Sequence, residues 1–296
     1  MWIIEWDTPT YGHLKGVKRV LYKGRSRYQE IELVESHDFG KLLLLDGKSQ
    51  SSEHDEFVYH EALVHPAMVL HPRPRRVLIL GGGEGATLRE VLKHRSVEEA
   101  IMVDIDEEVV RVSRELWGEL SAGAFEDRRA KVVIGDALEY IAGSPGKFDV
   151  IIADLSDPLE AGPSYKLYTL ETYRRIGELL DGGVFVTQAA SPSNTPQTHA
   201  IIYNTVRSAF KFAAYYHAFM NSFSGLWGFV IASNELDPRG LTAGLAARRL
   251  AERGIATRFY DATSHLNMFS VPKHLREFIE GERRISTLSS PAYMPA

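Results

Sequence analysis

The fold is decided by residues 75 to 89, which read Arg-Arg-Val-Leu-Ile-Leu-Gly-Gly-Gly-Glu-Gly-Ala-Thr-Leu-Arg. The apolar run between the basic residues and the glycines predicts a buried strand. The glycines allow a tight turn and a close approach of the backbone to a ligand, and a helical pattern resumes at Thr87. The segment therefore predicts a strand, a glycine loop and a helix start, with a ligand bound at the turn.

The glycine loop fits the nucleotide-binding pattern Gly-x-Gly-x-x-Gly/Ala through Gly81, Gly83 and Ala86. An acid, Asp104, ends the next apolar run about twenty residues later, where such folds bind ribose hydroxyls. Taken alone, the loop is equally compatible with a nicotinamide or flavin nucleotide, or with a tight turn that binds nothing.

Acids follow three successive apolar runs between residues 100 and 154, at Asp104, Asp136 and Asp154. Helical patterns separate these runs, and this alternation predicts a parallel sheet whose strands end at one common edge. The arrangement resembles the class I methyltransferase-like fold, which binds S-adenosyl compounds. We therefore expect an α/β, Rossmann-type, mostly parallel sheet with a nucleoside site at the carboxyl ends of its strands.

The first 53 residues differ from the rest of the chain. Short segments with partial apolar and polar alternation end at Asp46-Gly47, a favoured hairpin dipeptide. We expect a small N-terminal antiparallel β-hairpin domain over residues 1–53 and a Rossmann-like catalytic domain over residues 54–296. Because a small β unit is marginal alone, it should pack on the larger domain or on a second subunit, as a homodimer or homotetramer.

Composition narrows the classes of partner. The chain has 296 residues, a formal net charge of -5 and no cysteine, which excludes disulfides, thiolate metal sites and cysteine nucleophiles. Basic residues are scattered, so nucleic acid is not an expected partner. No apolar run approaches the ~20 residues of a membrane span and the start lacks a signal-peptide pattern, so we expect a cytoplasmic protein without a membrane partner. The histidines show no ligand spacing, so no metal site is expected.

Glu84 indicates the kind of ligand. A carboxylate in the glycine loop opposes the carboxylate of ordinary S-adenosylmethionine, but it suits a donor that has an amine and no carboxylate. The alternative is a solvent-facing acid in an early helical turn.

Asp154 and Asp157 stand three residues apart ahead of Pro158. Two carboxylates in one pocket can hold a cationic amine, and one of them can take the proton that the amine must lose before its nitrogen attacks carbon. The alternative is a turn-capping Asp followed by Asp-Pro, a common turn signal.

These residues belong to a set of motifs that resembles the spermidine synthase (polyamine aminopropyltransferase) family over residues 5 to 235. The resemblance is carried by Gln29, Leu44-Leu45-Asp46-Gly47 with Gln50, Asp55-Glu56-Phe57-Val58-Tyr59-His60-Glu61, Gly81 to Thr87, Val103-Asp104-Ile105-Asp106, Gly135-Asp136-Ala137 and Asp154-Leu155-Ser156-Asp157-Pro158.

The resemblance implies transfer of an aminopropyl group from decarboxylated S-adenosylmethionine, as co-substrate, to a polyamine, with release of 5'-methylthioadenosine and without a metal or prosthetic group. Putrescine, giving spermidine, is the first choice of acceptor. Asp154 is then the proton acceptor. The residues implied to bind the acceptor are Tyr59, His60, Asp157 and Gln188, and those implied to bind the donor are Gln29, Gln50, Gly81, Gly83, Glu84, Asp104, Asp136, Ala137 and Pro163.

The sequence departs from the family pattern at three positions. Glu84 stands where the family usually has Asp, Ala86 replaces a glycine, and Ser222 replaces an acceptor-site Tyr. The segments around Gln188 and Trp227 resemble thermospermine-synthase-like members. Agmatine, cadaverine or spermidine are therefore alternative acceptors. A methyltransferase using ordinary S-adenosylmethionine, or a binder without activity, are the remaining alternatives.

Overall fold

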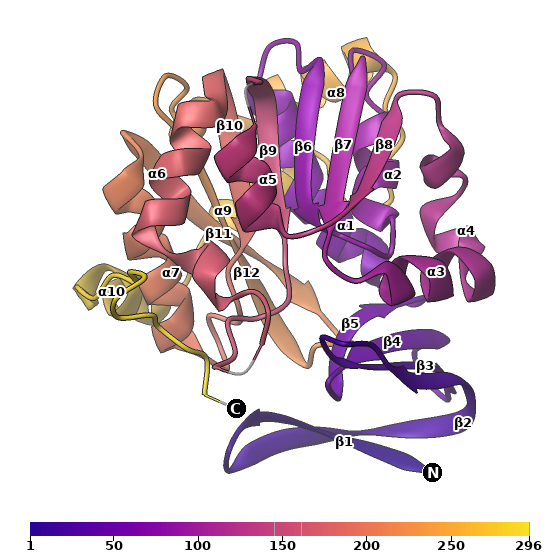
Figure 1. Ribbon diagram of the computed structural model, residues 1–296. Coiled ribbons are helices and arrows are strands. Elements are labelled where there is room, and N and C mark those ends of the chain that lie inside the picture. Colours follow the sequence, from indigo (N-terminus) through magenta and orange to yellow (C-terminus); the bar gives the residue numbers. More distant parts are fainter. Residues whose placement is uncertain (145, 161, 296) are drawn as a thin grey trace.

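The computed structural model describes residues 1–144, 146–160 and 162–295, which form two sheets with helices around the larger one (Figure 1). The smaller, N-terminal sheet is antiparallel with its strands in sequence order: β1 (Trp2–Thr8), β2 (Tyr11–Arg25), β3 (Glu30–Ser36), β4 (Lys41–Leu45) and β5 (Lys48–Ser52). At the β4–β5 turn Asp46 and Gly47 have φ values of 48° and 75°. Positive φ at both turn residues is typical of a tight hairpin, so the hairpin predicted at Asp46-Gly47 is confirmed.

The larger sheet has the strand order β11-β12-β10-β9-β6-β7-β8. Strands β6 to β10 pair in parallel, whereas β12 runs antiparallel to β10 and to β11. The expected α/β, Rossmann-type, mostly parallel sheet is thus confirmed. The strands are β6 (Arg76–Gly81), β7 (Glu99–Asp104), β8 (Ala130–Ile134), β9 (Phe148–Asp154), β10 (Leu180–Gln188), β11 (Phe212–Met220) and β12 (Gly225–Ser233).

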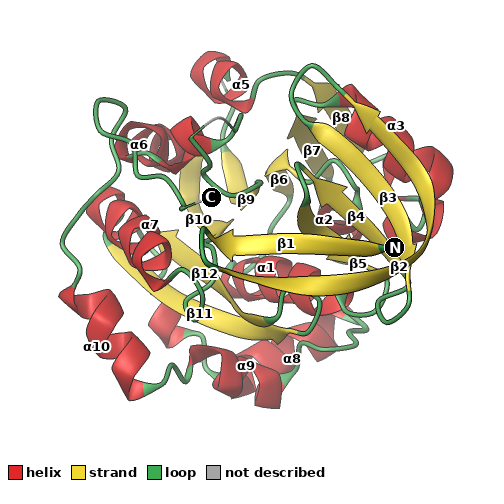
Figure 2. Cartoon of the chain, turned by 90° about the horizontal axis from the view of Figure 1, so that it is seen from below, coloured by secondary structure: helices red, strands yellow, loops and turns green. Residues whose placement is uncertain are grey.

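Helices cover both faces of this sheet (Figure 2). One face packs against α1, α2, α8 and α9, the other against α5, α6, α7 and α10, because alternate residues of each buried strand point to opposite faces. The helices are α1 (Glu56–Leu70), α2 (Ala86–Leu92), α3 (Glu107–Leu116), α4 (Gly118–Ser121), α5 (Ala137–Gly143), α6 (Leu170–Leu179), α7 (Pro196–Ala209), α8 (Ala243–Arg253), α9 (Ala262–Phe269) and α10 (Lys273–Gly281).

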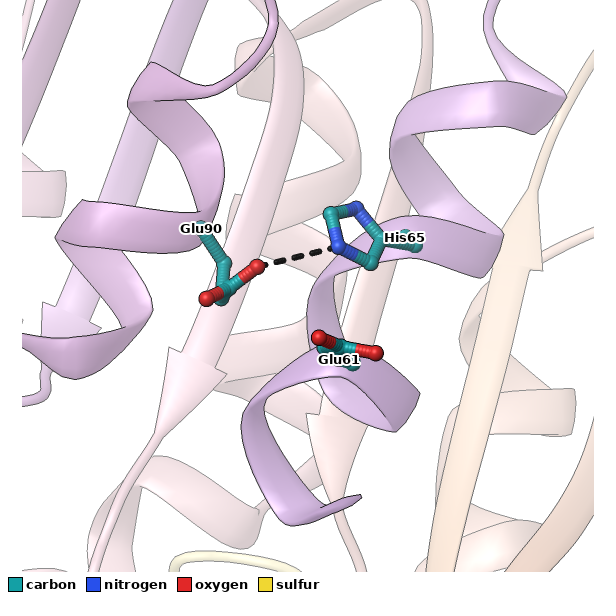
Figure 3. Close-up of side chains that lie close together, drawn as sticks. All are labelled: Glu61, His65 and Glu90. Carbon is teal, nitrogen blue, oxygen red and sulfur yellow. Dashed lines mark hydrogen bonds and ion pairs between the residues drawn. The ribbon is translucent and has the colours of Figure 1, made fainter. Parts of the chain in front are cut away.

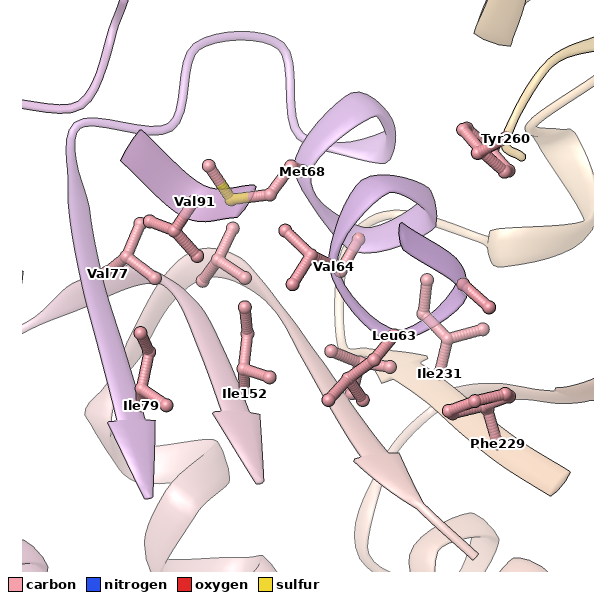
Figure 4. Close-up of a cluster of buried hydrophobic side chains, with 14 of the residues drawn as sticks. Leu63, Val64, Met68, Val77, Ile79, Val91, Ile152, Phe229, Ile231 and Tyr260 are labelled. Atoms are coloured by element: carbon pink, nitrogen blue, oxygen red, sulfur yellow. The ribbon is translucent and has the colours of Figure 1, made fainter. Parts of the chain in front are cut away.

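Helix α1 is the centre of the first of these cores. Leu63, Val64 and Met68 pack on Ile79 and Ile152 of the sheet (Figure 4), and almost every residue of the helix is buried. A helix that is buried all round carries its polar side chains into the interior, where each needs a partner. Several of these polar side chains belong to the site described below.

One expectation from the sequence was wrong in detail. The apolar spacing of Val109, Val110, Leu116 and Leu120 predicts one amphipathic helix over residues 107–120. The helix breaks at Trp117, whose ring is buried and whose backbone leaves the helical region, so that α3 and α4 are separate. Strand β11 and helices α9 and α10 were not predicted. Within the described ranges, no helix combines the length and apolar character that crossing a membrane requires.

Tyr293 and Met294, near the C-terminus, lie against the segment that follows β9. The Met294 amide donates a hydrogen bond to the Pro158 carbonyl oxygen at 2.9 Å. The rings of Tyr293 and Tyr165 lie 5.4 Å apart between centroids. The C-terminal segment therefore packs against the loop that carries Pro163.

Candidate active site

A cavity opens where the carboxyl ends of β6, β7 and β9 face the N-terminal sheet. Its empty volume, open mouth included, is about 1000 Å³. Of the residues predicted for the site, all but His60 line this one cavity: Gln29, Gln50, Tyr59, Gly81, Gly83, Glu84, Asp104, Asp136, Ala137, Asp154, Asp157, Pro163 and Gln188. Residues from both sheets therefore form its wall.

The glycine loop fits tightly between two of the acids. Gly81 has φ of +81°, and a Cβ there would lie 2.1 Å from the Asp154 carbonyl oxygen. The Gly83 amide donates to Asp104 Oδ2 at 2.9 Å, and a Cβ at Gly83 would lie 2.7 Å from the same oxygen. Only glycine permits this approach, so the loop holds Asp104 and Asp154 in place by backbone contact.

Asp154 ends β9 deep in the cavity. Its Oδ1 accepts a hydrogen bond from the Tyr59 hydroxyl at 2.8 Å, and its Oδ2 accepts one from the Thr87 hydroxyl at 2.6 Å. Burial raises the pKa of Asp154, and the nearby Glu84 acts in the same direction. A carboxylate with a raised pKa is a better proton acceptor, which is the chemistry expected of Asp154.

Asp157 lies three residues further along the chain, in the loop after β9. Its Oδ1 accepts a hydrogen bond from Gln188 Nε2 at 3.2 Å, and that same nitrogen lies 2.6 Å from the Tyr168 hydroxyl. Burial raises the pKa of Asp157 to about 6 despite the hydrogen bond from Gln188. Asp157 and Gln188 thus form a second polar group at the acid-lined end of the cavity.

Glu84 faces the cavity and does not point to solvent. Its Oε1 accepts a hydrogen bond from the Ser51 hydroxyl at 2.5 Å and lies 2.7 Å from His60 Nε2. No described residue pairs with Oε2 of Glu84, and the residue lines the cavity. One carboxylate oxygen is therefore fixed by the protein and the other is available to a ligand.

His60 occupies a different place from the one we expected. Its side chain is fully buried behind Glu84 and is not among the described residues that line the cavity. Both ring nitrogens contact carboxylates at 2.7 Å, Nδ1 with Glu56 and Nε2 with Glu84. His60 therefore orients Glu84 from behind, and direct acceptor binding by this histidine does not follow from the geometry.

The opposite end of the cavity is built around Asp104. Burial raises its pKa to about 6, and Oδ1 accepts the Asp106 amide at 2.8 Å. Asp106 in turn accepts a hydrogen bond from Gln29 Nε2 at 2.9 Å. The Asp136 side chain caps α5 beside Ala137 by accepting from the Leu138 amide.

Four residues in or next to the site were given no role in the sequence analysis. Ser51 and Thr87 lie behind the cavity wall, where their hydroxyls hold Glu84 and Asp154. Phe223 and Trp227 form an aromatic wall. Ser222, expected in place of an acceptor-site Tyr, instead points to Asp55, with its hydroxyl 2.6 Å from Oδ1.

A further buried polar group lies outside the cavity, between α1 and α2. The ligand atoms of Glu61, His65 and Glu90 lie within 4.8 Å of one another (Figure 3). Three backbone amides, from residues 258 to 260, already donate to Glu61. The Lys93 ammonium lies 2.7 Å from Glu90. The protein's own donors and cations thus occupy these carboxylates, so the cluster does not make a metal site.

The strand order and the acid-lined cavity at the strand ends place the protein in the class of Rossmann-like α/β proteins whose ligands bind at the carboxyl ends of the parallel strands. Comparisons with known proteins narrow this class. Residues 56–239 match the family model of the spermine/spermidine synthase domain, and residues 1–53 match that of the spermidine synthase tetramerisation domain. The chain belongs to the spermine/spermidine synthase family and is an aminopropyltransferase of this family.

Relatives match over the full length. A polyamine aminopropyltransferase of Aeropyrum pernix is 55% identical and one of Sulfurisphaera tokodaii 45%, each across 100% of this chain and 96% and 98% of its own. A spermidine synthase crystallised with the transition-state analogue AdoDATO has a TM-score of 0.89 at 34% identity, covering 95% of this chain and 96% of its own. The spermidine synthase of Thermotoga maritima has a TM-score of 0.86 at 34% identity, covering 95% and 94%.

Proposed function

We propose that this enzyme transfers the aminopropyl group of decarboxylated S-adenosylmethionine to a polyamine and releases 5'-methylthioadenosine. Putrescine, giving spermidine, is the first choice of acceptor. The observation that carries the proposal is the placement of Glu84, a buried carboxylate at the cavity wall with one oxygen free for a ligand. An ammonium group is attracted to this position, whereas the carboxylate of ordinary S-adenosylmethionine is repelled.

The nucleoside part of the donor fits the other end of the cavity. Asp104 has the place of the acid that binds ribose hydroxyls in related folds. Asp136 and Ala137 are proposed to bind the adenine. Gln29, Gln50 and Pro163 complete the wall around the nucleoside. In this orientation the sulfonium lies between Asp104, which is proposed to hold the ribose, and Glu84, which is proposed to hold the ammonium group.

The acceptor amine is proposed to lie between Asp154 and Asp157. Its neutral nitrogen attacks the methylene carbon bonded to the sulfonium sulfur, a C–N bond forms, and the C–S bond breaks with its electron pair left on sulfur. The proton released by the nitrogen passes to Asp154, whose raised pKa favours the transfer. Asp157 and Gln188 hold the amine, and the Tyr59 hydroxyl orients Asp154.

One assay tests both substrates. We would present putrescine, agmatine, cadaverine and spermidine together with the decarboxylated donor, and in a parallel reaction with ordinary S-adenosylmethionine, and identify the products by mass. The expected result is release of 5'-methylthioadenosine with spermidine as the main product. Thermospermine as the main product would reassign the acceptor. Turnover of ordinary S-adenosylmethionine alone would indicate a methyltransferase, and binding without any product would indicate a non-catalytic binder.

The pKa of Asp157 leads to a prediction about pH. The carboxylate is charged above about pH 6 and protonated below it in the free enzyme. Because the charged form attracts the ammonium group, kcat/KM for the acceptor should fall as the pH drops through 6. The profile would be measured at saturating donor, and Asp157→Asn should remove this ionisation. An identical profile from pH 5 to 7 in the enzyme and in Asp157→Asn would contradict the prediction.

We also propose that the chain forms a homodimer or homotetramer through the β1–β2 ribbon. Trp2, Ile4 and Trp6 alternate along β1 with 69%, 55% and 50% exposure, and Leu14, the register partner of Ile4, is 62% exposed. Alternate residues share one face of a strand, so these side chains form an apolar face of the kind that marks an interface.

Charges placed on this face should break the assembly. The double variant Ile4→Glu, Leu14→Glu is expected to lower the mass measured by light scattering after size exclusion to that of a smaller assembly or a monomer. Leu266→Glu is the matched control, since Leu266 is 58% exposed on α9, away from the ribbon. An unchanged mass in the double variant would place the interface elsewhere.

A further inference from the structure

Glu84 is the first member of a buried row of alternating charges that leads away from the cavity. Behind it lies His60, whose Nδ1 is 2.7 Å from Glu56 Oε2. The same Glu56 oxygen accepts a hydrogen bond from Arg89 Nη2 at 2.8 Å. Glu56 and His60 lie on α1, whereas Arg89 lies on α2, the helix that follows the glycine loop.

The row continues on the far side of Arg89. Arg89 Nε donates to Glu90 Oε1 at 2.9 Å. The other oxygen of Glu90 is 2.7 Å from the Lys93 ammonium. The same oxygen is 3.0 Å from His65 Nε2 (Figure 3). Arg89 therefore stands between two carboxylates, one of which leads back to the cavity.

Each charge in the row fixes the ionisation of its neighbour. Burial disfavours an imidazolium at His60, but the hydrogen bonds with Glu56 and Glu84 outweigh it and raise the pKa to about 10. With both ring nitrogens donating, His60 is the cation between two anions. Burial likewise disfavours charge on Glu56, and its contacts with His60 and Arg89 nevertheless keep its pKa below the usual value.

We propose that Arg89 is a positioning residue for the donor's ammonium group, acting through Glu56 and His60 on Glu84. The inference rests on the proposed function, since it assigns the ammonium of the decarboxylated donor to Glu84. Arg89 is not among the described residues that line the cavity. Its guanidinium reaches Glu56 with Nη2 and Glu90 with Nε, so one positive charge serves both carboxylates.

The physical reason is the alternation of charge. Without Arg89, Glu56 keeps a single cationic partner, and a buried carboxylate left short of a cation takes up a proton. A neutral Glu56 no longer attracts the positive charge of His60, which Glu56 and Glu84 otherwise share. His60 then pairs with Glu84 alone and competes with the ammonium of the donor. The nucleoside part of the donor, held by Asp104 at the other end, is unaffected.

The experiment compares two ligands that differ in the aminopropyl group. In Arg89→Met we expect the KM for the decarboxylated donor to rise about tenfold, which is the factor that corresponds to one pKa unit. The kcat should change by less than about threefold. The Kd of 5'-methylthioadenosine, which lacks the ammonium, should stay unchanged in calorimetry. Arg89→Lys keeps the charge and should recover most of the donor KM.

Arg253→Met is the matched control. Arg253 is also an arginine against α1, but it donates to the carbonyl oxygens of Met68, His71 and Pro72 at the end of the helix. Its loss should lower the melting temperature without changing the donor KM. If Arg89→Met does not fold, Glu56→Gln tests the same interaction between Arg89 and His60 with a side chain of equal size. It should likewise raise the donor KM and leave the Kd of 5'-methylthioadenosine unchanged.

Three results would overturn the inference. They are an unchanged donor KM in Arg89→Met, an equal loss of donor and 5'-methylthioadenosine binding, and an Arg89→Lys variant no better than Arg89→Met. Failure of the unmodified enzyme to use the decarboxylated donor is a separate result, which would contradict the proposed function first.

Discussion

Asp154→Asn is expected to lower kcat by about 10² to 10⁴, the range that loss of a positioned proton acceptor gives. The asparagine has nearly the shape of the aspartate. Its Oδ1 can still accept a hydrogen bond from one of the two hydroxyls, those of Tyr59 and Thr87, which lie 2.8 and 2.6 Å from the carboxylate oxygens, and its Nδ2 can donate to the other. What it lacks is the ability to take the proton from the attacking amine. Release of 5'-methylthioadenosine in a single turnover measures the effect.

The control for Asp154→Asn is binding. Asp104 and the nucleoside end of the cavity are untouched, so the Kd of 5'-methylthioadenosine should stay within about twofold, as expected for a site that keeps its other contacts. Full activity in Asp154→Asn would exclude Asp154 as the proton acceptor. Loss of nucleoside binding together with activity would instead indicate a disturbed glycine loop, since Gly82 donates its amide to the Asp154 carbonyl oxygen.

Glu84→Gln is expected to raise the KM for the decarboxylated donor about 10-fold to 100-fold. A hydrogen bond to a charged group contributes about 1.5–3 kcal/mol, and each 1.4 kcal/mol corresponds to a factor of ten. Ordinary S-adenosylmethionine should bind more tightly to the variant, because its carboxylate no longer meets a like charge. The change in the ratio of the two affinities, measured by competition, is therefore larger than either change alone.

The conservative variant Glu84→Asp separates charge from shape. It keeps the carboxylate but shortens the side chain. If the negative charge determines the affinity for the donor's ammonium group, this variant should retain more donor affinity than Glu84→Gln. It also has to reach Ser51 and His60, which hold Oε1 at 2.5 and 2.7 Å. Equal affinities of Glu84→Gln and the unmodified enzyme for both donors would show that the ammonium binds elsewhere.

The cavity could be predicted well because its acids stand at strand ends. Asp104 and Asp154 close β7 and β9, and the order of parallel strands brings such ends together whatever the details of the helices. The glycine loop then fixes their distance. Periodicity and strand order are local and repetitive signals, so one sequence suffices to read them.

The positions of His60 and Ser222 show that the direction in which a buried side chain points could not be predicted from the sequence. Both were assigned to the acceptor end, yet His60 lies behind Glu84 and Ser222 binds Asp55. Helix α1 is buried on nearly all sides, so its pattern has no polar face from which the direction of a given side chain could be inferred. The depth of a residue depends on contacts with distant segments, and these follow only from the packed structure.

Strand β11 was missed for a related reason. Its residues, Phe212 to Met220, mix aromatic and small side chains without a regular alternation. Strand β11 forms because the edge of β12 is free to pair with it. The two strands pair antiparallel over the whole length of β11. Such a strand is specified by its neighbour more than by its own pattern.

The cavity wall contains side chains from both sheets, and this has a consequence for unfolding. Ser51 on β5 binds Glu84, and Gln29 before β3 binds Asp106, so a ligand in the cavity is enclosed by both units at once. A ligand at about 100 times its Kd stabilises the state it binds by about 2.7 kcal/mol. That energy is lost if either unit opens. We therefore expect a ligand bound in the cavity to act as a cross-link that makes the two units melt together.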